Sequence, residues 1–291
     1  MIDLFKRSNS PQAPAASRSI CVWGPAGAPG KTTLAVNLAS ELALEGKRVL
    51  LIDLDTYSPS ISDHFGLVGQ PPGLTAAARL VGQGRFDLEQ IERLAVRYEV
   101  GVGQLAILTG LSSSSRWPEI SAEKIEGMLA VALEQFEFVV VDIASPLESS
   151  IRQVGGAIDR NVAARTALAR CNLVLAVVAA DPIGVKRFLD AHEALSVLAS
   201  NVQVIANRLR SSALGVKARQ QVDDALVEFT GRSAAAFIPA DCDSCDKALF
   251  EMVPLAMMKR SSPARQAIAQ FARLNFVPSE ARKSRRVAKL D

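Results

Sequence analysis

Residues 24–33, Gly-Pro-Ala-Gly-Ala-Pro-Gly-Lys-Thr-Thr, contain the groups of this chain that are best placed to do chemistry. The segment follows the apolar run 19–23 and leads into residues 32–45, where apolar residues recur at helical spacing. A glycine-rich turn between a strand and a helix points several backbone N–H groups at one spot. That spot suits a polyphosphate, with Lys31 as a point charge and the Thr32 hydroxyl as a Mg²⁺ ligand. The alternative is a turn that only joins the two elements.

We therefore predict that the segment binds a nucleotide, ATP or ADP, together with Mg²⁺. Its glycines fall at 24, 27 and 30, whereas the simplest phosphate-loop pattern has glycine at the position that Pro25 occupies here. The predicted nucleotide contacts in this segment are Gly27, Ala28, Pro29, Gly30, Lys31, Thr32 and Thr33.

Carboxylates follow two of the other apolar runs. Asp53 and Asp55 come directly after 47–52, and Asp142 comes directly after 138–141. An acid at the end of a hydrophobic strand can hold Mg²⁺ through water, so we predict this role for Asp142, with a turn cap as the alternative. Asp53 is a second candidate near the metal, and ordinary turn chemistry explains it equally well.

The glycine-rich segment resembles the deviant Walker A loop of the ParA/MinD family of partition and positioning ATPases, whose core is Lys-Gly-Gly-x-Gly-Lys-Thr-Thr. Ala26 takes the place of the family's signature lysine, and Ala28 replaces the second glycine. In the family this lysine reaches across an ATP-sandwiched dimer to the partner's phosphates, which alanine cannot do. The resemblance implies weakened dimerisation and hydrolysis, or a substitute cation. The candidate substitutes are Arg152, Arg160, Lys186 and Arg187.

The resemblance extends over the rest of the chain. It implies that Asp55 positions the attacking water, which makes Lys31 and Asp55 the predicted catalytic residues. Asn207, after the run 202–206, corresponds to the family's adenine-reading asparagine, with Pro239 and Asp241 as weaker neighbours. A helix N-cap is the alternative role for Asn207.

Two further segments bear on the resemblance. Residues 248–255 resemble a family stretch ending in Gly-x-Pro, with Met252 in place of the glycine. Within the family the chain is most similar to the CpaE/TadZ-like branch, which is linked to pilus assembly and polar placement. That similarity is carried by the loop, by Leu-Thr-Gly-Leu at 108–111 with Arg116 and Trp117, and by Ala-Asp-Pro-Ile-Gly at 180–184.

The elements that hold these residues predict an α/β fold, a doubly wound and mostly parallel sheet with helices on both faces. Continuous rather than alternating apolar runs are typical of strands buried on both sides. The expected strands are 19–23, 47–52, 105–108, 138–141, 173–179, 202–206 and 234–238. The expected helices are 32–45, 121–135, 161–170, 184–198, 216–230 and 262–276. We expect a flexible segment over 1–18, one ATPase domain over 19–277 and a basic tail over 278–291.

Composition bears on the cellular compartment of the protein and on the surfaces that it contacts. The 291 residues are 49% hydrophobic, yet no apolar run approaches the ~20 residues of a membrane span. Without a signal peptide, the four cysteines indicate reduced thiols in a cytoplasm. Plain solvation is the leading interpretation of the basic tail, and contact with an anionic membrane or with DNA phosphates is the alternative. Cys242 and Cys245 have metal-ligand spacing but supply two ligands of four.

Together these features predict a cytoplasmic ATP-binding protein that positions a cellular cargo through a nucleotide-dependent dimer switch. The cargo classes are a pilus or secretion apparatus, the division site or DNA. The expected activity is weak hydrolysis of ATP to ADP and phosphate, with a stimulating or anchoring protein partner. The periphery of the inner membrane and the nucleoid are alternative locations. A nucleotide-binding scaffold with little turnover is the alternative function, because Ala26 lacks the signature charge.

Overall fold

The apolar runs of the sequence form one eight-stranded sheet in the computed structural model, which describes residues 18–27, 29–67, 69–101, 103–149, 159–258 and 261–277. The strand order is β3-β4-β2-β5-β1-β6-β7-β8. All neighbours in these ranges are parallel except β3 and β4. The strands are β1 (Arg18–Trp23), β2 (Arg48–Leu54), β3 (Val96–Val100), β4 (Gly103–Leu108), β5 (Phe138–Ile143), β6 (Leu173–Ala179), β7 (Val202–Leu209) and β8 (Ala234–Pro239).

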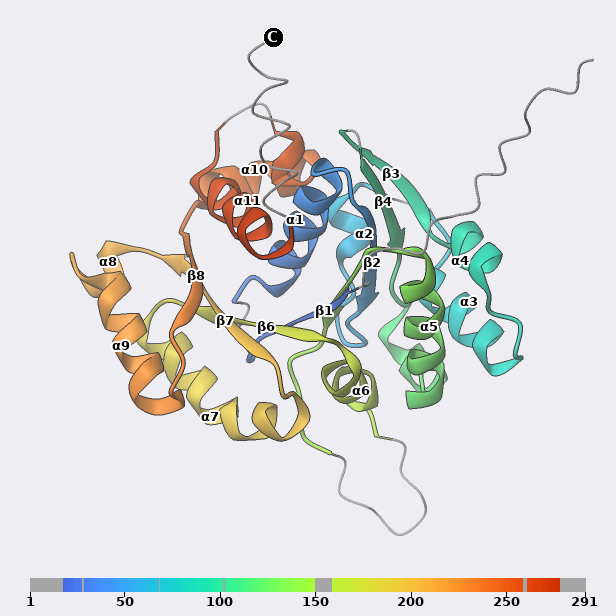
Figure 1. The fold of residues 1–291 in the computed structure, drawn as a ribbon, viewed down its shortest axis with the longest axis horizontal. Coiled ribbons are helices and arrows are strands. Elements are labelled where there is room, and N and C mark those ends of the chain that lie inside the picture. The colour runs from blue at the N-terminus through green and yellow to red at the C-terminus, as the bar shows by residue number, and fades with distance from the viewer. Residues whose placement is uncertain are drawn as a thin grey trace, which may run out of the picture.

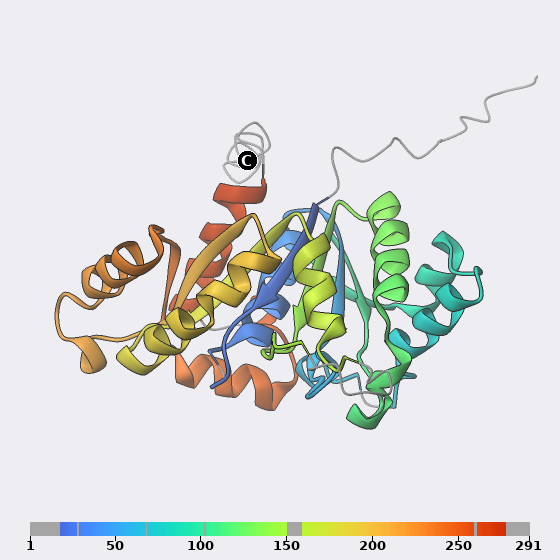
Figure 2. The same cartoon turned by 90° about the horizontal axis from the view of Figure 1, so that it is seen from below.

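Helices cover both faces of this sheet (Figures 1 and 2), which confirms the predicted doubly wound α/β fold. One face carries α1 (Lys31–Leu44), α2 (Ile61–His64), α10 (Cys242–Glu251) and α11 (Pro263–Phe276). The other carries α3 (Gly73–Gly82), α4 (Leu88–Leu94), α5 (Ala122–Gln135), α6 (Val162–Arg170), α7 (Pro182–Leu198) and α9 (Ala218–Thr230). Short elements complete the described chain: η1 (Ser114–Glu119), α8 (Ser211–Leu214) and η2 (Leu255–Met257).

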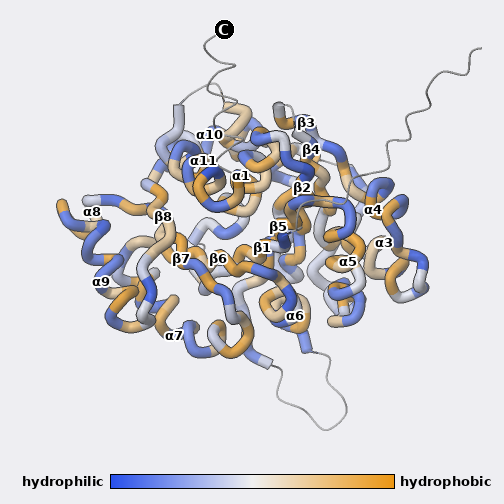
Figure 3. Tube along the Cα trace, in the orientation of Figure 1, coloured by the Kyte–Doolittle hydropathy of each residue, from blue (hydrophilic) through white to orange (hydrophobic). Residues whose placement is uncertain are grey.

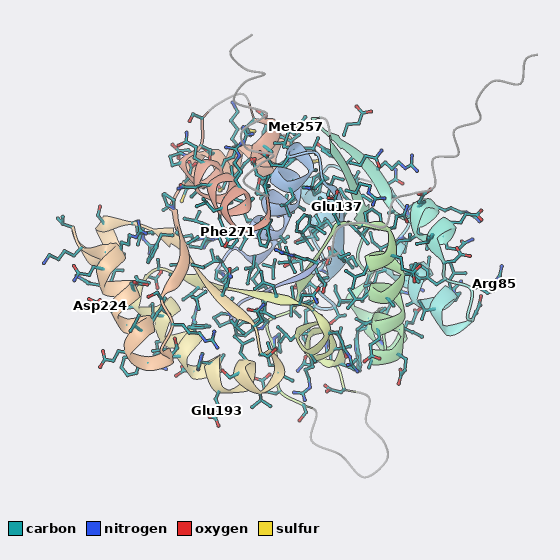
Figure 4. The ribbon with its side chains drawn as sticks, viewed as in Figure 1. Arg85, Glu137, Glu193, Asp224, Met257 and Phe271 are labelled. Carbon is teal, nitrogen blue, oxygen red and sulfur yellow. The ribbon has the colours of Figure 1, made fainter. Side chains whose placement is uncertain are left out.

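Each central strand sends its side chains alternately into two apolar cores. In β1, Ile20 and Val22 face the core under α1 and α11, whereas Cys21 and Trp23 face the core under α5, α6 and α7. The apolar colouring of the central strands is visible in Figure 3. Phe271, labelled on α11 in Figure 4, is 4% exposed and belongs to the first core. Burial on both faces is the physical reason for the continuous apolar runs.

The structure corrects the predicted strands in two ways. The antiparallel edge strand β3 was not predicted, because its alternating pattern Val-Arg-Tyr-Glu-Val is half exposed rather than continuously apolar. In addition, β2, β5 and β7 extend past their predicted ends, so Asp53, Asp142 and Asn207 lie within strands rather than after them. Among the described residues, none of the helices combines the length and apolar character needed to cross a bilayer.

The strand order decides where chemistry can occur. β1 lies at the centre of the sheet between β5 and β6, and β2 flanks β5 on its other side. The parallel strands end at the same edge, so the loop after β1 lies beside the acid-bearing ends of β2 and β5. In open α/β sheets this edge is where ligands bind.

Met252 occupies a backbone conformation that favours glycine. It follows α10 with φ 54° and ψ 42°, the left-handed region. The Val253 N–H bonds to the Ala248 carbonyl at 3.0 Å, which is the hydrogen-bond pattern of a helix end that usually has glycine at this position. The geometry therefore explains why glycine suits the place that Met252 fills.

We expect Met252→Gly to stabilise the fold by roughly 0.5–1 kcal/mol, because it removes the left-handed strain of a residue with a Cβ atom. Met252 is 47% exposed, so substitution by glycine or by alanine gives up about the same partial burial, and the difference between the two variants reports the backbone strain. Met252→Ala is the matched control: it removes the same side chain but keeps the Cβ atom. Urea unfolding should rank glycine above both methionine and alanine. Equal destabilisation by the two substitutions would refute the assignment of strain.

Candidate nucleotide-binding site

Backbone conformation shapes the loop between β1 and α1. Gly27 and Gly30 have φ values of 107° and 92°, both in the left-handed region. A Cβ atom on Gly30 would lie 2.5 Å from the amide nitrogen of Asn207, so this position also lacks room for a side chain. Gly30 is the N-cap of α1 and contributes no capping side chain, which leaves the first N–H groups of the helix to other partners. The first N–H groups of α1 are thus directed toward the loop, where they can bind a phosphate.

Lys31 connects this loop to both neighbouring acid-bearing strands. Its ammonium group donates a hydrogen bond to the Ser145 hydroxyl at 3.0 Å, just beyond β5. It also lies 3.7 Å from a carboxylate oxygen of Asp55, just beyond β2. The side chains of Lys31 and Asp55 are only 11% and 10% exposed, so their charges interact with little solvent screening.

Thr32 and Asp142 form the candidate metal site. The Thr32 hydroxyl donates to Oδ2 of Asp142 at 2.6 Å, while the buried Oδ1 of Asp142 has no hydrogen-bond partner among the described residues. Burial raises the pKa of the Asp142 carboxyl to about 7, although the Thr32 hydrogen bond and the Lys31 charge oppose the shift. An unpaired buried carboxylate oxygen beside a hydroxyl fits Mg²⁺ or a water bound to it, because Mg²⁺ prefers oxygen ligands.

Asp53 lies opposite Asp142 in the register of β2 and β5. Its Oδ2 accepts the backbone N–H groups of Ser60 and Ile61 at 2.9 and 3.0 Å, and its Oδ1 accepts that of Asp55 at 3.2 Å. Burial and the charge of Asp142 raise the pKa of Asp53 well above its usual range, against these hydrogen bonds. The geometry gives Asp53 the turn-fixing role that the sequence left open. Its metal contact stays a prediction.

Asp55 combines a local role with a position in the site. Its Oδ1 accepts the N–H groups of Tyr57 and Ser58, both at 2.9 Å, which fixes the turn after β2. Its Oδ2 faces Lys31. One oxygen therefore orients the side chain while the other is directed to Lys31, an arrangement compatible with the predicted water-positioning role of Asp55.

A cavity of about 410 Å³ adjoins the loop on the β7–β8 side of the sheet. The three predicted base-contact residues, Asn207, Pro239 and Asp241, all line it together with Gly30 and Thr33 of the loop. The structure thus brings the predicted base and phosphate contacts to one continuous surface.

Asn207 also supports the loop directly. Its amide nitrogen donates to the Pro29 carbonyl at 2.7 Å across the β1–β6–β7 surface. The alternative reading of Asn207 as a helix N-cap is wrong, because the residue lies inside β7 and the next helix begins after Arg210. The remaining amide N–H and the amide oxygen leave Asn207 able to contact a base.

Asp241 forms the opposite wall of the cavity. Its carboxylate accepts hydrogen bonds from the Ser262 hydroxyl and from the N–H groups of Ser244 and Ala264, which join the starts of α10 and α11. Partial burial alone would raise the pKa of Asp241, but these hydrogen bonds outweigh it and lower the pKa. Asp241 is therefore a charged group that fixes the cavity wall.

The candidate replacements for the signature lysine occupy different environments. The guanidinium of Arg160 stacks on the Tyr57 ring at 4.0 Å from its centroid. The exposed Lys186 is ion-paired with Asp190 one turn along α7. Arg187 contacts the loop itself at Gly27. Arg160 and Lys186 therefore have partners away from the loop, whereas Arg187 has none among the residues that the structure describes.

Several sequence predictions lie outside the described residues. They include Ala28 of the loop, Arg152 among the cations and the basic residues 281–289 of the tail. The cysteine pair is described: Cys242 is exposed, and burial together with the charge of Asp241 raises the pKa of the Cys245 thiol to about 11. No cluster of three or more metal-ligating side chains is present in the described part of the chain.

Sequence reasoning missed Ser145 and Tyr57. Ser145 accepts the Lys31 hydrogen bond, and the Tyr57 hydroxyl donates to Asn161 at 2.8 Å, joining the turn after β2 to the start of α6. Ser145 follows the predicted metal acid by three residues, and Tyr57 follows Asp55 by two. The closeness of Ser145 and Tyr57 in sequence to the predicted acids is the feature from which their place at the site could have been predicted.

The fold, the glycine-rich loop and the acids at the sheet edge define a P-loop nucleotide-binding protein. The family model described as the CobQ/CobB/MinD/ParA nucleotide binding domain matches residues 20–255, and the chain belongs to this family. The predicted ParA/MinD relationship is thereby confirmed.

Individual relatives agree with this assignment. The chain is 26% identical over 255 residues to an uncharacterized ATP-binding protein of Methanocaldococcus jannaschii, covering 87% of this chain and 86% of the relative. The fold is similar to that of the septum site-determining protein MinD complexed with Mg-ADP from Pyrococcus horikoshii, with TM-score 0.70, 18% identity and coverage of 91% and 98%. It is also similar to the MinC:MinD cell division protein complex of Aquifex aeolicus, with TM-score 0.67, 21% identity and coverage of 90% and 97%.

We expect Asp142→Asn to remove a pH dependence of stability. An ordinary aspartate has a pKa of 3.8, but the pKa of folded Asp142 is about 7. Between these values the folded state binds more protons than the unfolded state, so the free energy of unfolding falls as pH rises, by up to about 4 kcal/mol from this residue. Above pH 7 the contribution is constant.

The measurement is urea unfolding between pH 4 and 8 in chelator and without nucleotide. The difference between wild type and Asp142→Asn reports the titration of Asp142 together with its charge interaction with Asp53, and the part of the Asp53 shift that burial causes is common to both proteins. The stability difference should change in favour of the asparagine variant as pH rises. Parallel pH profiles for the two proteins would contradict the proposed protonation of Asp142.

Proposed function

We propose that the chain is an ATP-binding and ATP-hydrolysing switch that positions a cellular cargo by nucleotide-controlled self-association. The observation that carries this proposal is the meeting of Lys31, Thr32, Asp55 and Asp142 at the centre of the sheet edge. A lysine and helix N–H groups favour phosphate, while two carboxylates on adjacent strands supply a metal contact and a water-positioning group.

Each residue has a distinct task in this proposal. The loop N–H groups and Lys31 bind phosphate oxygens, and Asn207 holds the loop in place through Pro29. Thr32 and Asp142 would hold Mg²⁺, which when bound neutralises charge that develops on the phosphates. Asp55 orients water through the oxygen that its backbone hydrogen bonds leave available.

A γ-phosphate competes with Ser145 for the Lys31 ammonium, because a charge-assisted bond to phosphate is stronger than one to a hydroxyl. It also competes with Asp55, because the 3.7 Å between Lys31 and Asp55 is longer than a charge-assisted hydrogen bond. Release of these partners changes the segments after β2 and β5. Tyr57 and Asn161 join those segments, so we propose that they respond together. Ordering of loops by a terminal phosphate is a known form of switching.

Relatives support the wider setting of the proposal. One solved neighbour is MinD with Mg-ADP and another is a MinC:MinD complex. We accordingly propose Mg²⁺ with ATP or ADP as ligands, a homodimer with ATP and a separate protein partner. The CpaE/TadZ-like motifs favour a pilus or secretion apparatus as cargo, and a cytoplasmic site at the inner membrane or nucleoid.

The second candidate is a nucleotide-binding scaffold with little turnover. Ala26, in place of the signature lysine, is the observation that favours it. A steady-state rate above background that is lost in Asp55→Ala would exclude the scaffold, because that substitution removes the water-positioning group while preserving Lys31. Nucleotide binding without turnover in both proteins would favour it.

The switch predicts a nucleotide-dependent molar mass, measured by light scattering with ATP·Mg²⁺ and with ADP·Mg²⁺. We expect a dimer with ATP only, and a monomer under both conditions for Lys31→Ala, which loses the phosphate-binding charge. Lys247→Ala, on the exposed side of α10, is a control for loss of one lysine. An unchanged mass with bound ATP would contradict the self-association switch.

A further inference from the structure

A second depression, of about 260 Å³, lies against the phosphate loop. The loop contributes Pro25, Ala26, Gly27 and Pro29 to its wall. Its charged lining consists of three arginines, Arg187 of α7 and Arg208 and Arg210 at the end of β7, together with one carboxylate, Asp181. Arg208 and Arg210 also line the base cavity, so the two hollows adjoin at these side chains.

Arg187 approaches the loop at Gly27. A Cβ atom on Gly27 would lie 1.9 Å from a terminal nitrogen of its guanidinium, so the guanidinium occupies the space that a side chain at residue 27 would take. Gly27 directly follows Ala26, the position that lacks its lysine. The guanidinium thus lies beside the place where the loop is short of one positive charge.

The position of Arg187 is fixed by contacts at the start of α7. Asp181 caps this helix by accepting the Gly184 N–H at 2.8 Å. The other oxygen of Asp181 accepts a hydrogen bond from Arg210 at 3.3 Å, which joins the helix to the end of β7. Arg187 follows one turn later on a 17-residue helix, so its backbone is held relative to the loop.

The depression has surplus positive charge. Asp181 neutralises Arg210, but among the described residues no carboxylate pairs with Arg187 or Arg208. By contrast, Lys186 beside it is paired with Asp190, and Arg160 is stacked on Tyr57. Two unpaired guanidinium groups beside a phosphate loop indicate an anionic ligand, because the planar guanidinium matches phosphate oxygens in bidentate geometry.

We propose that Arg187 supplies the cation that Ala26 lacks and binds a phosphate group of the nucleotide. This inference rests on the proposed nucleotide-binding function. The phosphate belongs either to the nucleotide of the same protomer or to that of a second copy of the chain. Arg208 flanks the site and adds to its positive potential.

The test compares Arg187→Ala with Lys186→Ala, a neighbouring exposed lysine that serves as a matched control for charge. Affinity for ATP·Mg²⁺ and ADP·Mg²⁺ is measured with dilute monomer, and molar mass is measured with ATP·Mg²⁺ at higher concentration. We expect Arg187→Ala to weaken either nucleotide binding or dimerisation roughly 10- to 100-fold, because one charge-assisted phosphate contact is lost. Lys186→Ala should match wild type.

The two measurements separate the two phosphate sources. Weaker binding by dilute monomer assigns the contact to the same protomer, whereas normal binding with a weaker dimer assigns it to the partner. Restoring the charge in Ala26→Lys/Arg187→Ala should recover the lost association, because Ala26 is exposed and accommodates a lysine. If Arg187→Ala had the same nucleotide affinity and the same molar mass as Lys186→Ala, the inference would be overturned. Failure of wild type to bind ATP would instead overturn the proposed function.

Discussion

The hydrogen bond from Thr32 to Asp142 is the contact on which the arrangement of this site depends. It joins the first turn of α1 to the end of β5 and so fixes the glycine-rich loop against the strand that carries Asp142. The acid is fully buried, and its second oxygen has no protein partner in the described chain. Burial of such a group costs free energy unless a proton or a cation compensates it. The raised pKa and the proposed Mg²⁺ contact are two consequences of that single constraint.

Charge is distributed over several elements rather than concentrated in the loop. Lys31 is the only lysine of the glycine-rich segment, and it is shared between Ser145 after β5 and Asp55 after β2. Arg187 approaches the same loop from α7 on the other side. We expect a phosphate bound at this loop to affect several strands at once. Lys31 would exchange its contacts with Ser145 and Asp55 for the phosphate, and Arg187 would contribute its positive charge. With the proposed role of Arg187, the departure at Ala26 changes which element supplies a cation, while the loop keeps the backbone N–H groups that we propose to bind phosphate.

Much of the fold and most of the candidate site could be predicted from the sequence, for identifiable reasons. Buried parallel strands produce continuous apolar runs, and the glycine-rich loop has a local pattern, so both are visible without coordinates. The edge strand β3 was missed because exposure on one face gives it an alternating pattern. The bond from Asn207 to Pro29, and the approach of Arg187 to Gly27, join residues more than 150 positions apart. Such contacts depend on strand order, which local patterns do not specify.

The central claim, that Lys31 and the Thr32–Asp142 pair form a nucleotide site with Mg²⁺, is tested most directly by calorimetric titration with ATP. The chain should bind one ATP per protomer, with tighter binding in Mg²⁺ than in chelator. Lys31→Ala should lose roughly 10- to 100-fold in affinity, the effect of one charged hydrogen bond. Folding of the variant is verified by its urea unfolding curve. Two results together would contradict the account: wild type binds ATP equally strongly in Mg²⁺ and in chelator, and Lys31→Ala binds ATP as strongly as wild type.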